Sequence, residues 1–209
     1  MKKVFVILAL CLALLVATIA IAAWLSWQPQ SWYTPPDASQ PEVATLAQRA
    51  EYRLNEEFHK IRPVDEIWKI RINDKFMNAW LATRLEGWLT HDQDLEMPPE
   101  LHNPYVHVTT EGLWIGAMVE IDGDAPRPVA MQIAVNIENR MIRLEPRAIR
   151  LGKIPLPVSI FTQAVEEMQE EVFAIEAIAP LMDDREVEII SITLEDGALV
   201  LACKTILPN

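Results

Sequence analysis

Six side chains that could bind a metal ion fall within a span of 17 residues. They are three histidines and three carboxylates, namely His91, Asp92, Asp94, Glu96, His102 and His107. Imidazole nitrogens and carboxylate oxygens are common ligands of zinc. Their spacing matches no compact ligand motif, however, and an acidic loop with incidental histidines explains the same residues. We therefore expect no metal site, and a metal-dependent hydrolase is the least favoured of the functions considered.

Other patterns that support catalysis are missing from the sequence. No serine lies in the G-x-S-x-G context of a nucleophile, and the chain has no C-x-x-C, H-E-x-x-H or phosphate-binding loop motif. The acidic pair Asp183-Asp184 follows Pro180 and is typical of a solvated turn. We expect no catalytic residues and no cofactor, so the sequence favours a protein that is not an enzyme.

Basic residues gather in one stretch of an otherwise acidic chain. Between residues 140 and 153 only Glu145 interrupts a run of cations, which are Arg140, Arg143, Arg147, Arg150 and Lys153. Such a run can face anionic lipid headgroups. The alternative is that it pairs with the acidic residues Glu166 to Glu171. Our candidate headgroup-binding residues are Arg143, Arg147 and Arg150.

Composition limits the classes of function. The chain has 209 residues, 18 Lys and Arg against 30 Asp and Glu, and a net charge of -12. Nucleic-acid binding requires a basic surface, so we expect no nucleic-acid partner. Two cysteines cannot form a disulfide framework. The length indicates one domain with an additional tail.

The tail is an N-terminal membrane segment. Residues Val4–Trp27 carry no charge, and about 20 such residues span the hydrocarbon core of a bilayer. Lys2 and Lys3 precede the segment, which predicts a cytoplasmic N-terminus and an extracytoplasmic domain by the positive-inside rule. The run is longer than a signal-peptide core and favours an uncleaved single-pass anchor, although Ala20-Ile21-Ala22 also offers a cleavage pattern. We expect residues 4–27 to contact the lipid bilayer of the cell membrane, and residues 1–27 form the anchor.

Aromatic residues and prolines follow the anchor. Trp24, Trp27, Trp32 and Tyr33 are typical of side chains at the level of the lipid headgroups. Residues 28–41 contain four prolines and predict an extended spacer. Residues 42–209 then form the extracytoplasmic domain.

Hydrophobic periodicity predicts an α+β domain with a mainly antiparallel sheet packed on long amphipathic helices. That the sheet is curved is implied by the family resemblance given below. Helices are expected from Glu42 to Lys60, from Asp74 to about Leu89, and from about Ser159 to Ile178. Period-two alternation predicts strands at Ile67–Ile72, Tyr105–Thr110, Leu113–Ile121, Val129–Ile137, Met141–Arg150, Val187–Leu194 and Ala198–Ile206.

Two stretches carry a resemblance to a known family. They are Asn73-Asp74-Lys75-Phe76-Met77-Asn78-Ala79-Trp80-Leu81 and Ile149-Arg150-Leu151-Gly152-Lys153-Ile154-Pro155-Leu156-Pro157. Their order after an N-terminal anchor resembles the YpmS-type family of uncharacterised bacterial single-pass membrane proteins. The layout is also similar to tubular lipid-binding (TULIP-like) domains. The resemblance covers roughly residues 65 to 207 and implies a groove between helix and sheet for a lipid or other apolar ligand.

The leading hypothesis is therefore lipid binding at the cell envelope. The residues expected to line the groove are Trp80, Leu81, Trp88, Trp114, Met131, Ile133 and Val135. The alternative for these side chains is that they fill a closed core. The alternative for the protein is a non-enzymatic scaffold whose acidic faces dock another envelope protein.

Overall fold

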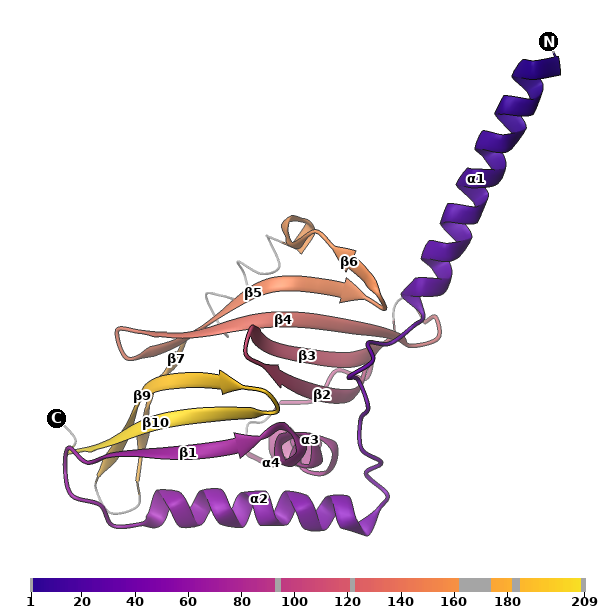
Figure 1. Cartoon of the computed structure of the whole chain (residues 1–209). Coiled ribbons are helices and arrows are strands. Elements are labelled where there is room, and N and C mark those ends of the chain that lie inside the picture. The colour runs from indigo at the N-terminus through magenta and orange to yellow at the C-terminus, as the bar shows by residue number, and fades with distance from the viewer. Residues whose placement is uncertain (1, 93–94, 121–122, 162–173, 182–184, 208–209) are drawn as a thin grey trace.

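The computed structural model describes residues 2–92, 95–120, 123–161, 174–181 and 185–207. An α+β domain is joined to one long apolar helix that projects away from it (Figure 1). The predicted fold class is thus confirmed. The strands form two antiparallel sheets rather than the one sheet expected from the sequence.

The projecting helix is α1, which spans Lys2–Ser26. Its segment Lys3–Ser26 has 24 residues and, among the described residues, is the only helix long and apolar enough to cross a membrane. Its apolar side chains are exposed because no part of the domain covers them. The length and composition suit a membrane anchor or a signal sequence and agree with the predicted contact with membrane lipid.

Sheet A contains the strands in the order β1-β10-β9-β8. Their bounds are β1 Ile67–Asn73, β10 Ala198–Ile206, β9 Glu186–Glu195 and β8 Ile178–Pro180. Helix α2, Pro41–His59, runs beneath β1 in Figure 1. Leu54 and Phe58 of α2 pack on the buried side chains of Trp68, Ile70 and Leu201, so burial of this helix stripe holds α2 on the sheet.

Sheet B contains the strands in the order β2-β3-β4-β5-β6, and β7 also pairs with β5. The bounds are β2 Leu101–Thr109, β3 Gly112–Val119, β4 Arg127–Glu138, β5 Met141–Leu151, β6 Ile154–Leu156 and β7 Ala174–Glu176. Leu113 lies opposite Ile133 and Trp114 lies opposite Gln132. Successive residues point to opposite faces, so Trp114 and Ile133 are on different faces of sheet B.

The second predicted helix is divided into two. Helix α3 spans Asp74–Thr83 and helix α4 spans Leu85–Asp92, where the sequence predicted one helix to about Leu89. Arg84 at the junction has φ −125° and ψ −28°, outside the helical region, although its N–H still bonds to the carbonyl of Trp80. Hydrophobic periodicity continues through Arg84, so the sequence pattern could not predict that the helix is interrupted at this residue.

The third predicted helix, Ser159 to Ile178, differs at both described ends. Val158–Phe161 forms the short 3-10 helix η1, and residues 174–176 form strand β7. Residues 162–173 lie outside the described residues. The backbone of β7 pairs with Met141–Arg143 of β5, so a tertiary partner determines the conformation there in place of local helix periodicity.

Candidate functional site

An apolar groove opens between α2 and α3. It has a volume of about 320 Å³ and is lined by Ala50, Glu51, Leu54, Ile72, Phe76, Met77, Trp80, Leu81 and Val106. Ligand pockets in proteins commonly measure about 300–1,000 Å³ and are mostly apolar. The groove contains two of the residues that the sequence predicted for lipid binding, Trp80 and Leu81.

A buried asparagine fixes the helix that forms the groove. Asn78 of α3 is 3% exposed, and its Nδ2 donates to the carbonyl of Val106 at 2.7 Å. Its Oδ1 accepts from the N–H of Val106 at 2.6 Å. The side chain therefore pairs with the outer edge of β2 as a neighbouring strand would, and it turns Trp80 and Leu81 toward α2.

The start of α3 is fixed by the hairpin of sheet A. The N–H of Asp74 donates to the carbonyl of Gly197 at 3.0 Å, and the N–H of Gly197 donates to the carbonyl of Val108 at 2.9 Å. Gly197 has φ +71°, which favours glycine at this turn. The β9–β10 turn thus connects α3 of the groove with the edge of sheet B.

Polar groups are confined to the rim of the groove. The indole N–H of Trp80 donates to Oε1 of Glu51 at 3.0 Å, and Nε of Arg84 lies 3.5 Å from the same oxygen. Trp88 of α4 meets Trp80 edge to face with ring centroids 5.9 Å apart, and Trp88 is 40% exposed. The interior can therefore accept an apolar chain, and the rim can hydrogen-bond a polar end group.

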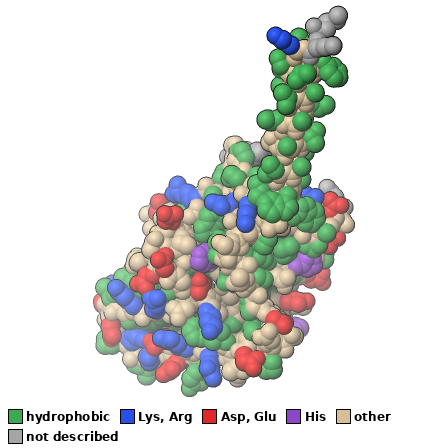
Figure 2. Space-filling model, turned by 45° about the vertical axis from the view of Figure 1, so that its right-hand side comes forward, with side chains coloured by type: hydrophobic (Ala, Val, Ile, Leu, Met, Phe, Trp, Pro, Cys, Tyr) green, Lys and Arg blue, Asp and Glu red, His purple; other side chains and the backbone are tan. Residues whose placement is uncertain are grey.

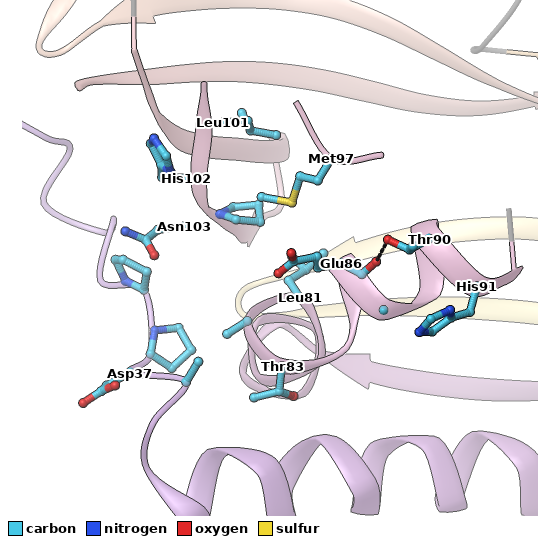
Figure 3. A pocket seen from close by; sticks show the side chains of 16 residues that line it. Asp37, Leu81, Thr83, Glu86, Thr90, His91, Met97, Leu101, His102 and Asn103 are labelled. Atoms are coloured by element: carbon cyan, nitrogen blue, oxygen red, sulfur yellow. Dashed lines mark hydrogen bonds between the residues drawn. The ribbon is translucent and has the colours of Figure 1, made fainter. Parts of the chain in front are cut away.

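A larger cavity of about 640 Å³ lies on the other side of α3. Residues Pro35–Ala38 form one side of it, and α3, α4 and the start of β2 form the other (Figure 3). Its lining mixes charged and polar side chains such as Glu86, His91 and His102 with a similar number of apolar ones. The smaller groove is the better candidate for an apolar ligand because its walls are almost wholly apolar.

The histidines of the sequence cluster do not form one site, because His91 and His102 line the larger cavity whereas His107 lies beside Asp74. Nε2 of His102 lies 4.0 Å from Glu120, whereas Nδ1 of His107 lies 3.7 Å from Asp74. In the part of the chain that the structure describes, no group of three His, Cys, Asp or Glu side chains could hold a metal ion. Asp94 and the side chain of Asp92 lie outside that part.

Trp114 lies away from the groove, on the outer face of sheet B. Its ring is 6.0 Å from the ring of Trp32, which also stacks on His107 at 5.3 Å. The rings of Trp32 and Tyr33 lie close to the backbone of β3 here. A Cβ added to Gly116 would lie 2.9 Å from the ring of Tyr33 and 3.1 Å from that of Trp32. Trp32 and Tyr33 therefore pack on the sheet. Their location at the level of the lipid headgroups stays a prediction.

Residues 28–38 run along the domain as a strap, the name we use for this segment below. Gln30 Nε2 donates to the carbonyl of Gly152, and Tyr33 Oη donates to the carbonyl of Asn103 at 2.8 Å. Burial of Tyr33 raises the pKa of its phenol to about 12. The first half of the predicted spacer is thus bound to sheet B and is not free.

The end of α1 is bound to sheet B as well. The N–H of Lys153 donates to the carbonyl of Leu25 at 3.0 Å, and Ser26 is 5% exposed. Gly152 has φ +56°, and a Cβ there would clash with the carbonyl oxygens of Leu25 and Ser26. Only glycine allows this approach of helix and turn.

The remaining predicted lipid-binding residues are on β4. Met131, Ile133 and Val135 share the face of sheet B opposite to Trp114, and Ile133 is 1% exposed. None of the three lines the groove. The sequence-predicted set is therefore divided among the groove, the strap-covered face and the opposite face of sheet B.

The predicted headgroup arginines are separated along β5. Arg143 pairs with Glu138 at 3.4 Å and Arg147 with Glu145 at 2.7 Å. Arg150 lies over the ring of Trp114 at 5.1 Å, and its Nη1 donates to Oε1 of Gln30 at 3.3 Å. Seven residues of strand separate Arg143 from Arg150 by about 23 Å, so they do not form one compact site.

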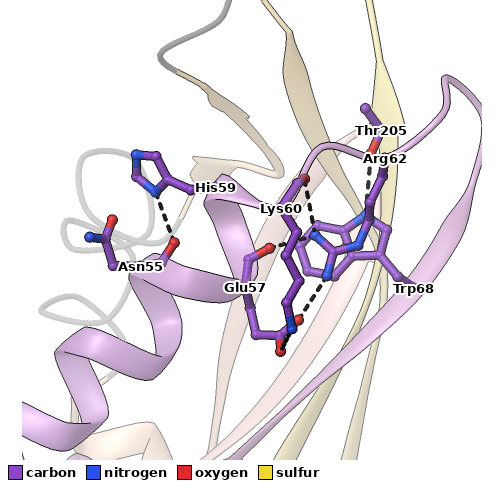
Figure 4. A network of polar contacts seen from close by, with 7 residues as sticks. All are labelled: Asn55, Glu57, His59, Lys60, Arg62, Trp68 and Thr205. Carbon is purple, nitrogen blue, oxygen red and sulfur yellow. Dashed lines mark hydrogen bonds and ion pairs between the residues drawn. The ribbon is translucent and has the colours of Figure 1, made fainter.

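A polar network terminates α2 at the end of the domain opposite α1 (Figures 1 and 4). Glu57 accepts from Lys60 and, at 2.7 Å, from Arg62, and these hydrogen bonds hold the pKa of its carboxyl below the usual value. Arg62 lies 3.8 Å above the ring of Trp68, whose indole N–H donates to Thr205 at 3.3 Å. The network is structural because it joins α2 to β1 and β10 away from the cavities.

No protein-family model matches the chain, and no curated protein sequence matches it. The resemblance to the YpmS-type family and to tubular lipid-binding domains therefore stays a prediction. The groove and its residues carry the functional argument on their own.

Proposed function

We propose that this protein is a membrane-anchored binding module that takes the acyl chain of a lipid, or a similar apolar chain, into the groove between α2 and α3. The observation that carries the proposal is the apolar lining of a groove of about 320 Å³ in a domain attached to an apolar helix. Each methylene buried there would contribute about 0.8 kcal/mol to binding. The rim pair Glu51 and Arg84 would contact the polar end of the ligand.

The proposal places the domain outside the cell. Lys2 and Lys3 lie at one end of α1, whereas the first charges after its other end are Asp37 and Glu42. This asymmetry supports a cytoplasmic N-terminus. Protease added to intact cells should then degrade the domain, and a domain protected until the membrane is opened would contradict this orientation.

A variant that fills the groove tests ligand binding. Ala50 lines the groove from α2, so Ala50→Phe should place a ring in the space that the ligand needs. Gln48→Phe adds the same ring to an exposed position of the same helix and is the matched control. The assay uses the full chain in detergent micelles, where a brominated fatty acid quenches tryptophan fluorescence by contact.

The expected quenching is saturable in the parent and in Gln48→Phe, and it is strongly reduced in Ala50→Phe. Trp80→Phe should remove most of the saturable signal because Trp80 lines the groove. Equal saturable quenching in a folded Ala50→Phe variant would show that the groove does not hold the fatty acid.

A second candidate function is docking of another envelope protein. Aliphatic side chains are exposed at the end of the domain opposite α1, with Ile61 at 89% and Ile67 at 61% exposure. A photo-crosslinker at position 67 in native membranes should give one discrete adduct that is lost in Ile61→Asp. The same adduct pattern from the exposed position of Tyr52 on α2 would contradict a specific docking surface.

A further inference from the structure

Basic side chains surround the point where α1 meets the domain. Arg127 begins β4, and Arg150 and Lys153 flank the turn between β5 and β6. Figure 2 shows Lys and Arg side chains on the face of the domain beside the base of the apolar helix. The net charge of the chain is -12, so a basic group at this location runs against the overall composition.

The contacts of α1 fix these side chains relative to the helix. Lys153 bonds through its backbone to Leu25, and the guanidinium of Arg127 lies over the ring of Trp27 at 4.7 Å. Lys3–Ser26 has 24 residues and is about 36 Å long at 1.5 Å per residue, compared with about 30 Å for the hydrocarbon core. The last turn of α1 therefore lies at headgroup level when the helix spans a bilayer, and Arg127 and Lys153 lie beside it.

The partners of these cations show which of them can bind a further anion. Arg150 already contacts Gln30 and Trp114. Arg127 has one ion pair, in which Nη2 is 3.5 Å from the largely exposed Asp124, and its buried Nε has no hydrogen-bond partner among the described residues. Lys153 is exposed and forms no ion pair with a described residue.

We propose that Arg127 and Lys153 bind the phosphate of an anionic phospholipid at the base of α1. A guanidinium presents a fork of donors that matches phosphate oxygens, and an ammonium adds a point charge. The site is distinct from the groove between α2 and α3, and it depends only on α1 spanning the membrane. Its lipid would position the domain against the bilayer, whatever the groove holds.

The test measures lipid selectivity of the full chain. The protein is inserted into nanodiscs of phosphatidylglycerol and phosphatidylcholine in equal amounts, and native mass spectrometry counts the lipids that stay bound on release. Each basic side chain near the surface contributes about fivefold in affinity. The parent should retain phosphatidylglycerol preferentially, and Arg127→Gln with Lys153→Gln should lower this preference by roughly 25-fold.

The control removes the same charge elsewhere. Arg143→Gln with Arg147→Gln acts on two exposed cations of β5 that already pair with Glu138 and Glu145, and it should leave the preference within about twofold. Arg127→Lys with Lys153→Arg should restore most of the preference. The single variant Lys153→Gln, which leaves the Arg127 contact with Trp27 intact, should lower it about fivefold.

Three results would overturn the proposal. The first is that the parent shows no preference for phosphatidylglycerol, and the second is that Lys153→Gln leaves the preference unchanged. The third is that millimolar inorganic phosphate displaces the lipid, which would indicate a site for free phosphate. The fatty-acid assay on the same variants should be unaffected, so failure here and failure of the groove proposal are separate outcomes.

Discussion

Replacement of Asn78 should destabilise the domain more than any exposed polar change. Asn78→Ala removes both hydrogen bonds to the backbone of Val106, whose carbonyl accepts from Nδ2 at 2.7 Å and whose N–H donates to Oδ1 at 2.6 Å. The side chain of Asn78 is 3% exposed. Leaving one buried backbone group without a partner costs about 1–3 kcal/mol. If water reaches one of the two groups, the expected loss is about 1–3 kcal/mol, and the upper value applies if the other group stays fully buried.

Asn78→Asp separates the two hydrogen bonds. The carboxylate can still accept from the N–H of Val106, but its second oxygen faces the carbonyl of Val106 and repels it. We expect this variant to be at least as unstable as Asn78→Ala. Asn55→Ala on the exposed part of α2 is the control, since it should change stability by less than about 0.5 kcal/mol.

Thermal unfolding of the full chain in detergent, followed by tryptophan fluorescence, measures the effect. A loss of 3 kcal/mol corresponds to a decrease in Tm of about 6–12 °C for a domain of this size. Asn55→Ala should shift Tm by less than about 2 °C. A Tm of Asn78→Ala within 2 °C of the parent would refute the argument that this side chain satisfies the edge of β2.

Three further predictions concern other features. Gly152→Ala should loosen the end of α1 and accelerate proteolysis of the strap. Gly123 also has a positive φ, but a Cβ added there would meet no atom within 4 Å, so Gly123→Ala should not accelerate proteolysis. Equal cleavage of the two variants would contradict the close contact at Gly152. The pKa of Glu57 is lowered in the folded state, so its carboxylate contributes fully to stability above the ordinary Glu pKa of 4.5, and this contribution is lost as the pH falls through the folded pKa. The Tm difference between the parent and Glu57→Gln should therefore disappear in acid. A Tm difference that does not change with pH would contradict this reasoning. Burial raises the pKa of Cys203 to about 11, so iodoacetamide at pH 8 should leave this thiol unmodified until the domain unfolds, and rapid alkylation of the native protein would argue against its burial.

Local sequence patterns predicted most elements of the fold. The strand expected at Val129–Ile137 is part of β4, and the strands expected at Val187–Leu194 and Ala198–Ile206 are β9 and β10. Period-two alternation is a property of neighbouring residues, so it can be read without knowing the tertiary structure. The helix expected at Glu42 to Lys60 is α2, for the same reason.

Long-range pairing could not be predicted in this way. β1 pairs with β10, which lies more than 120 residues away, and this pairing separates sheet A from sheet B. The division of the predicted lipid-binding residues has the same origin, because alternation along β3 and β4 does not show that α3 meets sheet B at the edge of β2. Trp80 and Leu81 both line one groove because they are neighbours on a single helix.

The contact of the strap with sheet B had a signal in the sequence. Gly116 stands inside a predicted strand, where glycine often marks a close approach of another chain segment. Trp32 and Tyr33 are large apolar side chains in a proline-rich segment and require a partner surface. The proximity of these aromatic residues to α1 instead favoured a location at the membrane interface, and that reasoning alone did not predict their contact with sheet B.

The strap imposes an order on biosynthesis. Gln30 bonds to Gly152, which is 122 residues later in the chain, and ribosomes add about 5–20 residues per second. Gln30 is therefore translated roughly 6–24 s before its partner carbonyl at Gly152 exists. The rings of Trp32 and Tyr33 pack on β2 and β3, so they stay exposed beside a hydrophobic helix until β3 is complete, and the nascent chain is most prone to misassociation before then. Closure of the strap is thus a late folding event that reports completion of sheet B.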